Sequence, residues 1–236
     1  MANDFDLLYK KLQSDIKKFS VAFKINKHIE VSPLPNTNTY YKDKAPPPTE
    51  RKLLHIHAYV VATHALFELF FEKVGLLLMS KSKEYYEQDR KINTFLKNLI
   101  SKKTKATEID KQFLKNVIVD AVNEFVNHID NNFEMSLKKL IDALDDSFQD
   151  YVGGDKGINS AQGMYDLLCE IAISKTPNEI LLVRFASFAK ERGDFAHKGI
   201  IKSTLSPATI QTWIDDILYI AKDVTEQAKT LITTII

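Results

Sequence analysis

Arg192 and His197 are two residues whose types and spacing suit chemistry on a phosphate group. They lie within residues 191–199, where a predicted helix ends. Arginine stays positively charged and presents a planar set of donors that matches a phosphate. Histidine exchanges a proton near neutral pH. Together the two side chains can hold a phosphate and move a proton, which is chemistry that needs no metal ion.

The surroundings distinguish this pair from Arg51 and His57, which have a similar spacing. His57 lies in a nearly all-apolar helix, where a reacting pair would be shut off from a substrate, whereas residues 192–197 lie at a polar helix end. Residues five apart differ by about 140° around a helix, so the two side chains share a face only if the helix loosens between them. Gly193 and Gly199 are expected to permit that loosening.

The helix that carries the pair has the best-defined start in the sequence. Thr176 is its predicted N-cap, Pro177 is its first helical residue, and a glutamate follows three positions after the cap. Gly199 is the predicted stop signal. Because residues 206–207, Ser-Pro, open one further helix, the pair belongs to the penultimate helix of the chain.

Residues 49 to about 79 form the most apolar stretch and are predicted to be a buried central helix. Its length would suit a membrane span, but charged and histidine side chains interrupt it, and charges are costly at mid-membrane. His57 and His64 are seven apart and share one face, a spacing that two metal ligands can have. No cysteine or carboxylate at ligand spacing completes such a site, so partnered core histidines are the favoured interpretation.

The N-terminal segment combines an amphipathic helix with a proline-rich loop. Residues 4–27 carry apolar side chains at helical spacing, with lysines on the other face. Residues 31–50 hold five of the seven prolines and are predicted to be a long extended loop. The predicted organisation is therefore an N-terminal helix and loop over 1–50, followed by a helical domain over 51–236.

Further helices are predicted over 84–100, over a long stretch from 107 to about 144, and over 160–174. Residues 153–157 are glycine-rich and mark a loop, without the spacing of a P-loop. No strand pattern is found, so the predicted fold class is all-α. A polar break after the first of these helices is a candidate contact for a nucleic-acid backbone and contains Lys102, Lys103 and Lys105.

Charge is unevenly distributed along the chain. Residues 1–118 hold 21 basic and 13 acidic side chains, and residues 119–236 hold 11 and 18. The basic half can attract a polyanion, or it can be an ordinary solvated surface. The single cysteine, Cys169, cannot form an internal disulfide, and the N-terminus lacks the basic and apolar regions of a secretory signal. A cytoplasmic location is expected.

An Arg-x4-His motif in the penultimate helix of a small all-helical chain resembles the HEPN superfamily, many of whose members are metal-independent ribonucleases. The apolar helix at 61–70 is similar to the early core helix of large HEPN groups in bacterial defence and toxin systems, and the resemblance covers residues 51–232. The family motif commonly runs from arginine through a polar residue to Ala-His and often glycine, an outline followed here by Arg192, Asp194, Ala196, His197 and Gly199. Two positions depart from it: Gly193 stands where asparagine is usual, and Lys198 separates the histidine from the glycine.

The resemblance implies an all-α HEPN-like helical bundle with long buried central helices. It also implies an endoribonuclease that cleaves RNA by 2′-hydroxyl attack, without metal or cofactor. His197 would transfer the proton, and Arg192 would hold the scissile phosphate. Asp194 would orient His197 or a partner arginine, or be a surface carboxylate, and Lys198 is a further candidate RNA contact.

The same resemblance sets the expected partners. One histidine cannot readily serve as base and acid at once, so a two-fold homodimer with both pairs facing one cleft is expected. RNA and a second copy are the expected partners, with an antitoxin or sensor protein as regulator. The expected role is in toxin–antitoxin or antiviral defence.

Two other classes of function stay open. In the first, Arg192 pairs with Glu191 or Asp194, His197 caps the helix end, and the protein is an inactive HEPN-like binding or scaffold module. In the second, the lysine-rich first helix binds a membrane surface or a partner. That helix has the regular apolar stripe of a core-facing helix and no exposed tryptophan anchor, so no membrane association is predicted.

Overall fold

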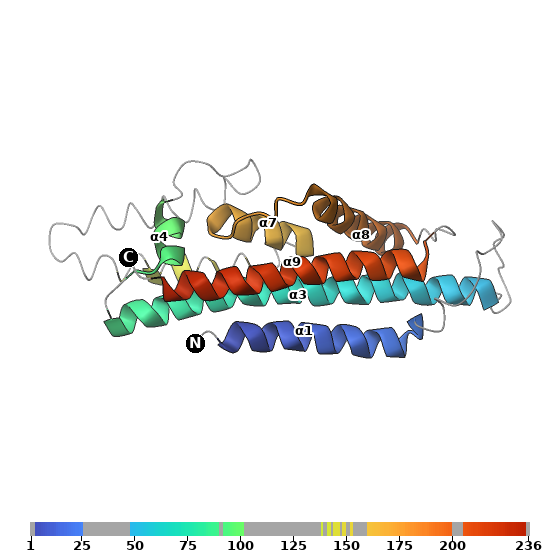
Figure 1. The fold of residues 1–236 in the computed structure, drawn as a ribbon, viewed down its shortest axis with the longest axis horizontal. Coiled ribbons are helices and arrows are strands. Elements are labelled where there is room, and N and C mark those ends of the chain that lie inside the picture. Colours follow the sequence, from blue (N-terminus) through green and yellow to red (C-terminus); the bar gives the residue numbers. More distant parts are fainter. Residues whose placement is uncertain are drawn as a thin grey trace. The chain divides into compact units, whose positions relative to one another are not determined.

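The computed structural model describes residues 3–25, 48–89, 92–101, 138, 141–142, 144–146, 148–149, 152, 160–199 and 205–234. Its regular elements in these ranges are α-helices, which confirms the all-α prediction. Figure 1 shows them as coiled ribbons. They are α1 (Asn3–Ala22), α3 (Pro48–Asp89), α4 (Thr94–Ser101), α7 (Ala161–Ile171), α8 (Glu179–Lys198) and α9 (Pro207–Thr233).

The chain forms two compact units, and each is described separately. The first unit consists of Met1–Leu8, Phe71–Lys175 and Asp223–Ile236. The second unit consists of Tyr9–Phe70 and Thr176–Lys222. Helices α1, α3 and α9 each contribute to both units.

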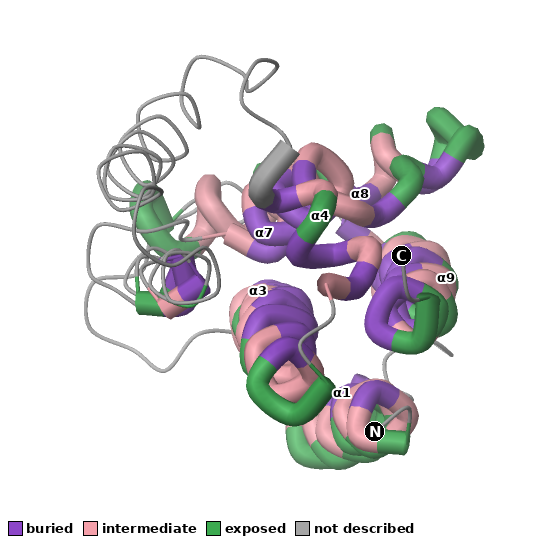
Figure 2. The backbone as a smooth tube through the Cα atoms, turned by 90° about the vertical axis from the view of Figure 1, so that its left-hand side faces the viewer, coloured by how far each residue is buried: buried purple, intermediate pink, exposed green. Residues whose placement is uncertain are grey.

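The second unit has an aromatic core that places α8 against α3 and α9. Phe188 of α8 meets Phe67 of α3 edge to face, with ring centroids 6.2 Å apart, and meets Trp213 of α9 at 6.5 Å. Arg184 of α8 is paired with Asp216 of α9 at 2.8 Å. Within this unit, α1 lies on the other side of α3 and α9 from α8 (Figures 1 and 2). Buried aromatic pairs add to the stabilisation that burial alone supplies, so α8 is firmly seated.

The first unit is built around a close approach at Gly75 of α3. A Cβ atom at this position would lie 3.3 Å from the Phe148 ring, so glycine allows that ring to pack directly on the helix. Phe148 also meets Phe95 of α4 edge to face at 6.3 Å. Phe71 of α3 packs against Tyr165 of α7 at 5.8 Å. These rings join α3, α4 and α7 into one core.

The first two described helices differ in length from the predictions. Helix α1 ends at Ala22 rather than at residue 27, because Lys24 adopts a positive φ of 55° and turns the chain. Helix α3 continues to Asp89, so the separate helix predicted from residue 84 is wrong over its first part. Nothing between residues 80 and 89 breaks a helix, and Lys81 pairs with Glu84 one turn later at 3.0 Å.

Two further boundaries also move. Helix α4 begins after Asn93, whose side-chain oxygen accepts from the Leu96 amide at 3.0 Å and acts as a cap. The N-cap of α8 is Asn178, which accepts from the Ile180 amide at 3.1 Å, and not Thr176 as predicted. Most of the proline-rich loop, of the stretch 107–144 and of the loop 153–157 lies outside the described residues. The division into 1–50 and 51–236 stays a prediction.

Candidate active site

Arg192 and His197 meet at the C-terminal end of α8. The Nη1 atom of Arg192 lies 3.2 Å from Nε2 of His197. Arg192 is half-buried, while His197 is exposed. The pair therefore combines a cation anchored at the helix surface with an imidazole that a ligand can reach.

The contact can be a hydrogen bond in only one direction. A guanidinium group only donates hydrogen bonds, so Nε2 of His197 must accept and can carry no proton while the contact lasts. A neutral imidazole with Nε2 free of hydrogen is the form that can remove a proton from a hydroxyl group.

The two side chains meet without any loosening of α8, contrary to the prediction. The helix runs without interruption from Glu179 to Lys198. The arginine side chain is long enough to pass around the helix surface to His197, so the 140° between the two positions is bridged by the side chain. Gly199 acts only as the stop signal: it has a φ of 63°, and its amide donates to the Phe195 carbonyl at 3.0 Å.

Asp194 and Lys198 form a second contact in the same turns. Lys198 Nζ donates to Asp194 Oδ1 at 3.1 Å, one helical turn apart. The Asp194 side chain is 13% exposed, and that of Lys198 is 64% exposed. Lys198 thus presents its charge to solvent in the last turn of the helix, where positive charge is favoured by the helix dipole.

Two histidines of α3 stack on two phenylalanines of α8. The His57 ring lies on Phe195 with centroids 5.0 Å apart and an interplanar angle of 18°. The His64 ring lies on Phe188 at 6.0 Å and 26°. Both histidines are buried, as predicted, at 0% and 1% exposure. The two phenylalanines bracket Arg192 along the helix, so these stacks border the candidate site.

His64 is electrostatically linked to the candidate site. Burial, together with the positive charge of Arg192, lowers its pKa from 6.5 to about 4. Its Nδ1 atom lies 3.8 Å from Glu68 Oε2, beyond hydrogen-bonding distance, and neither ring nitrogen has a hydrogen-bond partner among the described residues. The prediction of partnered core histidines is therefore confirmed for the burial of His64 but not for hydrogen bonding among the described residues. Its link to Arg192 was not expected from the sequence.

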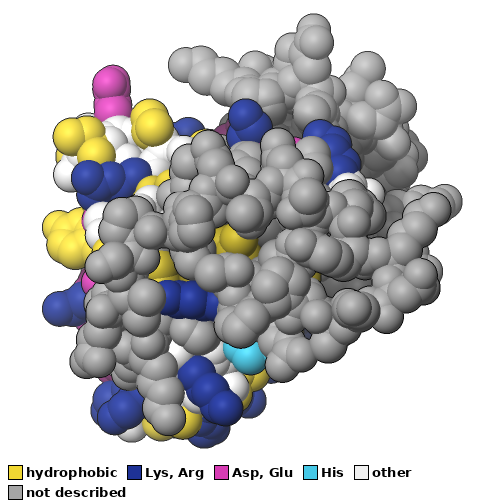
Figure 3. All heavy atoms as spheres, turned by 90° about the vertical axis from the view of Figure 1, so that its right-hand side faces the viewer, with side chains coloured by type: hydrophobic (Ala, Val, Ile, Leu, Met, Phe, Trp, Pro, Cys, Tyr) yellow, Lys and Arg dark blue, Asp and Glu magenta, His cyan; other side chains and the backbone are white. Residues whose placement is uncertain are grey.

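The other predicted nucleic-acid contacts are only partly described. Lys102, Lys103 and Lys105 lie outside the described residues. Figure 3 shows lysine and arginine side chains on one face, several of them near a histidine side chain. On α1 the exposed lysines are Lys10, Lys11, Lys17 and Lys18.

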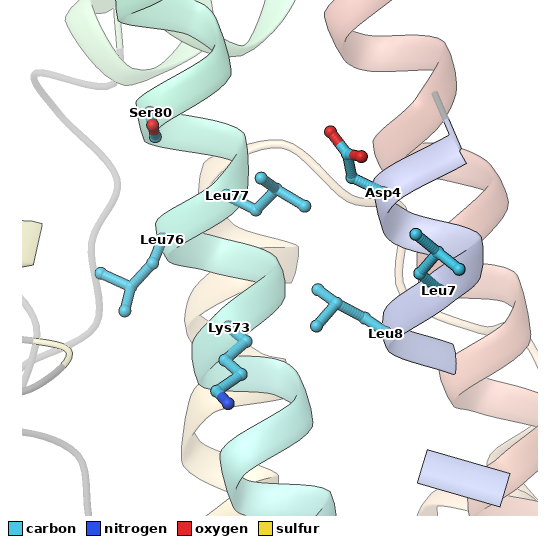
Figure 4. A pocket seen from close by; sticks show the side chains of 7 residues that line it. All are labelled: Asp4, Leu7, Leu8, Lys73, Leu76, Leu77 and Ser80. Carbon is cyan, nitrogen blue, oxygen red and sulfur yellow. The ribbon is translucent and has the colours of Figure 1, made fainter. Parts of the chain in front are cut away.

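An open groove of about 420 Å³ lies in the first unit, between the start of α1 and α3. Figure 4 shows leucine side chains of both helices beside it. None of the predicted site residues lines it, since its lining consists of Asp4, Leu7, Leu8, Lys73, Leu76, Leu77 and Ser80. In the described part of the chain, no three His, Cys, Asp or Glu residues gather in a way that could hold a metal ion.

Among the helices that the structure describes, none is long and apolar enough to cross a membrane. Neither the curated proteins nor the solved structures compared with the chain gave a match. The model of the RiboL-PSP-HEPN family, in contrast, matches residues 36–230, which is most of the chain and includes α3, α8 and nearly all of α9. The resemblance inferred from the Arg192 to Gly199 motif and the apolar central helix agrees with this match. The chain belongs to the RiboL-PSP-HEPN family of the HEPN superfamily.

Proposed function

We propose that this protein is a metal-independent endoribonuclease of the HEPN type. The observation that carries the proposal is the 3.2 Å contact between Arg192 and the exposed His197 at the end of α8. It lies in a chain of a superfamily whose members often cleave RNA. A cation that binds phosphate and a neutral imidazole with a free Nε2 lone pair are the groups that this reaction requires.

The reaction can be written from these two groups. A phosphate that enters the site accepts hydrogen bonds from Arg192 and releases the guanidinium from His197. Nε2 of His197 then removes the proton of the RNA 2′-hydroxyl. The 2′-oxygen forms a bond to phosphorus as the bond to the 5′-oxygen breaks, which leaves a 2′,3′-cyclic phosphate and a 5′-hydroxyl. Arg192 stabilises the negative charge that grows on the phosphoryl oxygens.

The leaving 5′-oxygen needs a proton from a second acid. Because one His197 acts as the base, the proposal places a second copy of the chain across a two-fold axis, so that its own His197, in the protonated form and separated from its Arg192, serves as the acid. The outer face of α8 supports this arrangement. Ile180 and Val183 are 61% and 64% exposed, and no described atom lies within 4 Å of a Cβ built on Gly193. A second copy would cover this face and bring the two pairs together.

The test is cleavage of total tRNA and of a structured messenger fragment in the presence of a metal chelator. Wild-type protein is compared with Arg192→Ala, His197→Ala and the double variant. Arg184→Ala is the matched arginine control, since Arg184 lies on the same helix but is paired with Asp216. His55→Ala is the matched control for an exposed histidine. Chelator-resistant cleavage should vanish in the first three variants only, and undiminished cleavage by both single variants would refute the mechanism.

The proposed biological role is in a toxin–antitoxin or antiviral system, with an antitoxin or sensor protein as regulator. Its support is the family membership, together with a site whose histidine is exposed and so open to a covering partner. Induced expression in a bacterial host should arrest growth, and the Arg192→Ala/His197→Ala double variant should not. Growth arrest by both proteins would refute a role that depends on RNA cleavage.

The inactive binding module stays a second candidate because Gly193 replaces the usual asparagine. A glycine there can neither orient the imidazole nor contact RNA. Gly193→Asn is the direct test, since the position has open space around it. Under the ribonuclease proposal the wild-type protein already cleaves RNA. Cleavage that appears only after Gly193→Asn would identify the wild-type chain as an inactive member.

A further inference from the structure

Helix α1 lies outside the part of the chain that the family model matches. The match begins at residue 36, whereas α1 ends at Ala22. From Tyr9 onward, α1 belongs to the second unit, where the Tyr9 ring meets Phe70 of α3 at 6.4 Å and its hydroxyl donates to the Leu218 carbonyl of α9 at 3.4 Å. The helix is therefore an addition that packs on the matched helices, and its outer face is a surface that the matched region does not supply.

The part of α1 in the second unit has an apolar side and a basic side. Leu12 and Ile16, at 4% and 6% exposure, belong to the buried core. Successive residues turn by about 100° around a helix. Five exposed residues fall within an arc of about 120° whose centre is opposite Leu12 and Ile16. These five form what we call the basic face, and they are Lys10, Lys11, Ser14, Lys17 and Lys18.

Few acidic groups offset the charge of the basic face. Residues 9–25 contain five lysines and one aspartate, Asp15. Asp15 pairs with Lys18 at 2.8 Å, yet the Lys18 side chain is still 71% exposed. The other three lysines of the basic face form no ion pair with any residue that the structure describes. Ammonium groups this close repel one another, so the binding of a polyanion is favoured.

The spacing of the lysines fits a nucleic-acid backbone. The pair Lys10 and Lys11 lies about two helical turns, or about 10.5 Å, from the pair Lys17 and Lys18. Each strand of a duplex carries one phosphate about every 3.4 Å along its axis, so the two pairs span about three phosphates. Lysine binds phosphate as a point charge on a flexible stem, so it adapts to a backbone of any sequence.

A membrane and a protein partner fit this face less well. A helix that binds a membrane surface inserts its apolar side, and the apolar side of α1 is buried in the core. Aromatic side chains at the end of α1 also pack inward, since Phe23 meets Tyr59 of α3 at 6.1 Å. Protein interfaces are depleted in lysine and use arginine and aromatic residues instead. The basic face offers neither, so phosphate groups of RNA are the favoured partner.

We propose that the basic face of α1 is a docking surface for the phosphate backbone of structured RNA, separate from Arg192 and His197. Within the second unit, α1 and α8 lie on opposite sides of α3 and α9 (Figures 1 and 2). Three layers of helices are about 30 Å thick, so an RNA that reaches both sites must pass around the bundle. The surface therefore selects long or folded RNA, such as tRNA, over short oligonucleotides. Only this effect on cleavage rests on the proposed ribonuclease function.

The test measures the binding of labelled tRNA by the full chain with Arg192→Ala/His197→Ala, so that bound RNA is not cleaved. All four lysines of the basic face are changed to glutamine. A charge-matched control changes four other exposed lysines to glutamine, namely Lys97, Lys138, Lys175 and Lys222. The first set should raise the Kd for tRNA at least ten-fold and lower the slope of log Kd against log salt by about three, whereas the control should not. Equal affinities and slopes in the two sets would overturn the proposal.

A vesicle assay and a cleavage assay separate the other outcomes. Flotation with phosphatidylserine vesicles that is lost in the lysine variant, while tRNA binding is unchanged, would assign the face to a membrane and overturn the proposal. In the otherwise wild-type chain, the four substitutions should raise KM for tRNA about ten-fold and leave kcat and the cleavage of a tetranucleotide unchanged. An equal loss with the tetranucleotide would overturn a separate docking surface. Binding of tRNA that depends on the four lysines, in a chain that cleaves no RNA, would refute the proposed function and leave the docking surface standing.

Discussion

Protonation of His64 should make the free energy of unfolding of this protein depend strongly on pH in the acid range. Folding buries the ring and lowers its pKa from 6.5 in the unfolded chain to about 4. Between these values the unfolded chain binds a proton that the folded chain does not, so the free energy of unfolding falls as the pH is lowered. A pKa difference of this size corresponds to about 3 kcal/mol. This part of the stability is fully present above pH 6.5 and is lost below pH 4.

The assay is urea unfolding followed by far-ultraviolet circular dichroism at several pH values between 4 and 7.5. His64→Phe removes the titrating group, while the other ionisable residues remain in both proteins and cancel in the difference. The variant should become more stable relative to the wild type by about 3 kcal/mol as the pH falls from 7.5 to 4. Ile16→Ala should be less stable than the wild type by a constant amount. Parallel curves for wild type and His64→Phe would refute the buried, neutral state of His64.

Three further predictions concern other positions. Gly193→Ala should raise the free energy of unfolding by about 0.5–1 kcal/mol, because a helical glycine with open space around it gains from a side chain. A lower melting temperature would contradict this. Asn93→Ala should lower the free energy of unfolding, measured with urea, by about 2 kcal/mol. Asn93 caps α4 by accepting from the Leu96 amide, and it donates to buried Ser82 at 2.8 Å. A loss below about 0.5 kcal/mol would show that water replaces both contacts. Lys198→Ala should change the free energy of unfolding by less than about 0.5 kcal/mol, because its ion pair with Asp194 is exposed at the lysine. The variant should bind RNA more weakly, with a salt dependence lower by about one counterion. An unchanged salt dependence would exclude a phosphate contact.

The presence of helices could be predicted from local sequence patterns. Several helix ends could not, because they depend on contacts that the periodicity of apolar residues does not reveal. The start of α9 at Pro207 agrees with the Ser-Pro signal, and Gly199 ends α8 as its conformational freedom suggests. The cap of α8 was misplaced by two residues because Thr176 and Asn178 are both good caps. The length of α3 was underestimated because the apolar run ends near residue 79, whereas the helix continues through polar residues to Asp89.

The candidate site was predictable in its location but not in its surroundings. The chemistry of Arg192 and His197 follows from residue type, and the end of α8 follows from Gly199. The stacking of His64 on Phe188 joins two segments that are more than 120 residues apart in the sequence. No local sequence pattern predicts such a contact. A signal did exist in the matching seven-residue spacing of His57 to His64 and of Phe188 to Phe195. Only the structure shows that the two histidine rings stack on the two phenylalanine rings.

The edge-to-face contact between Trp213 and Phe188 gives the protein a built-in optical probe. Trp213 is the only tryptophan in the chain, so the intrinsic emission at long ultraviolet wavelengths comes from one ring. Its neighbour Phe188 also stacks on His64 and lies about one helical turn before Arg192 on α8. Movement of this part of α8 when a polyanion or a covering protein arrives should therefore change the emission wavelength or intensity. Binding can be followed in real time on unmodified protein, without a dye that would compete for the exposed end of the helix.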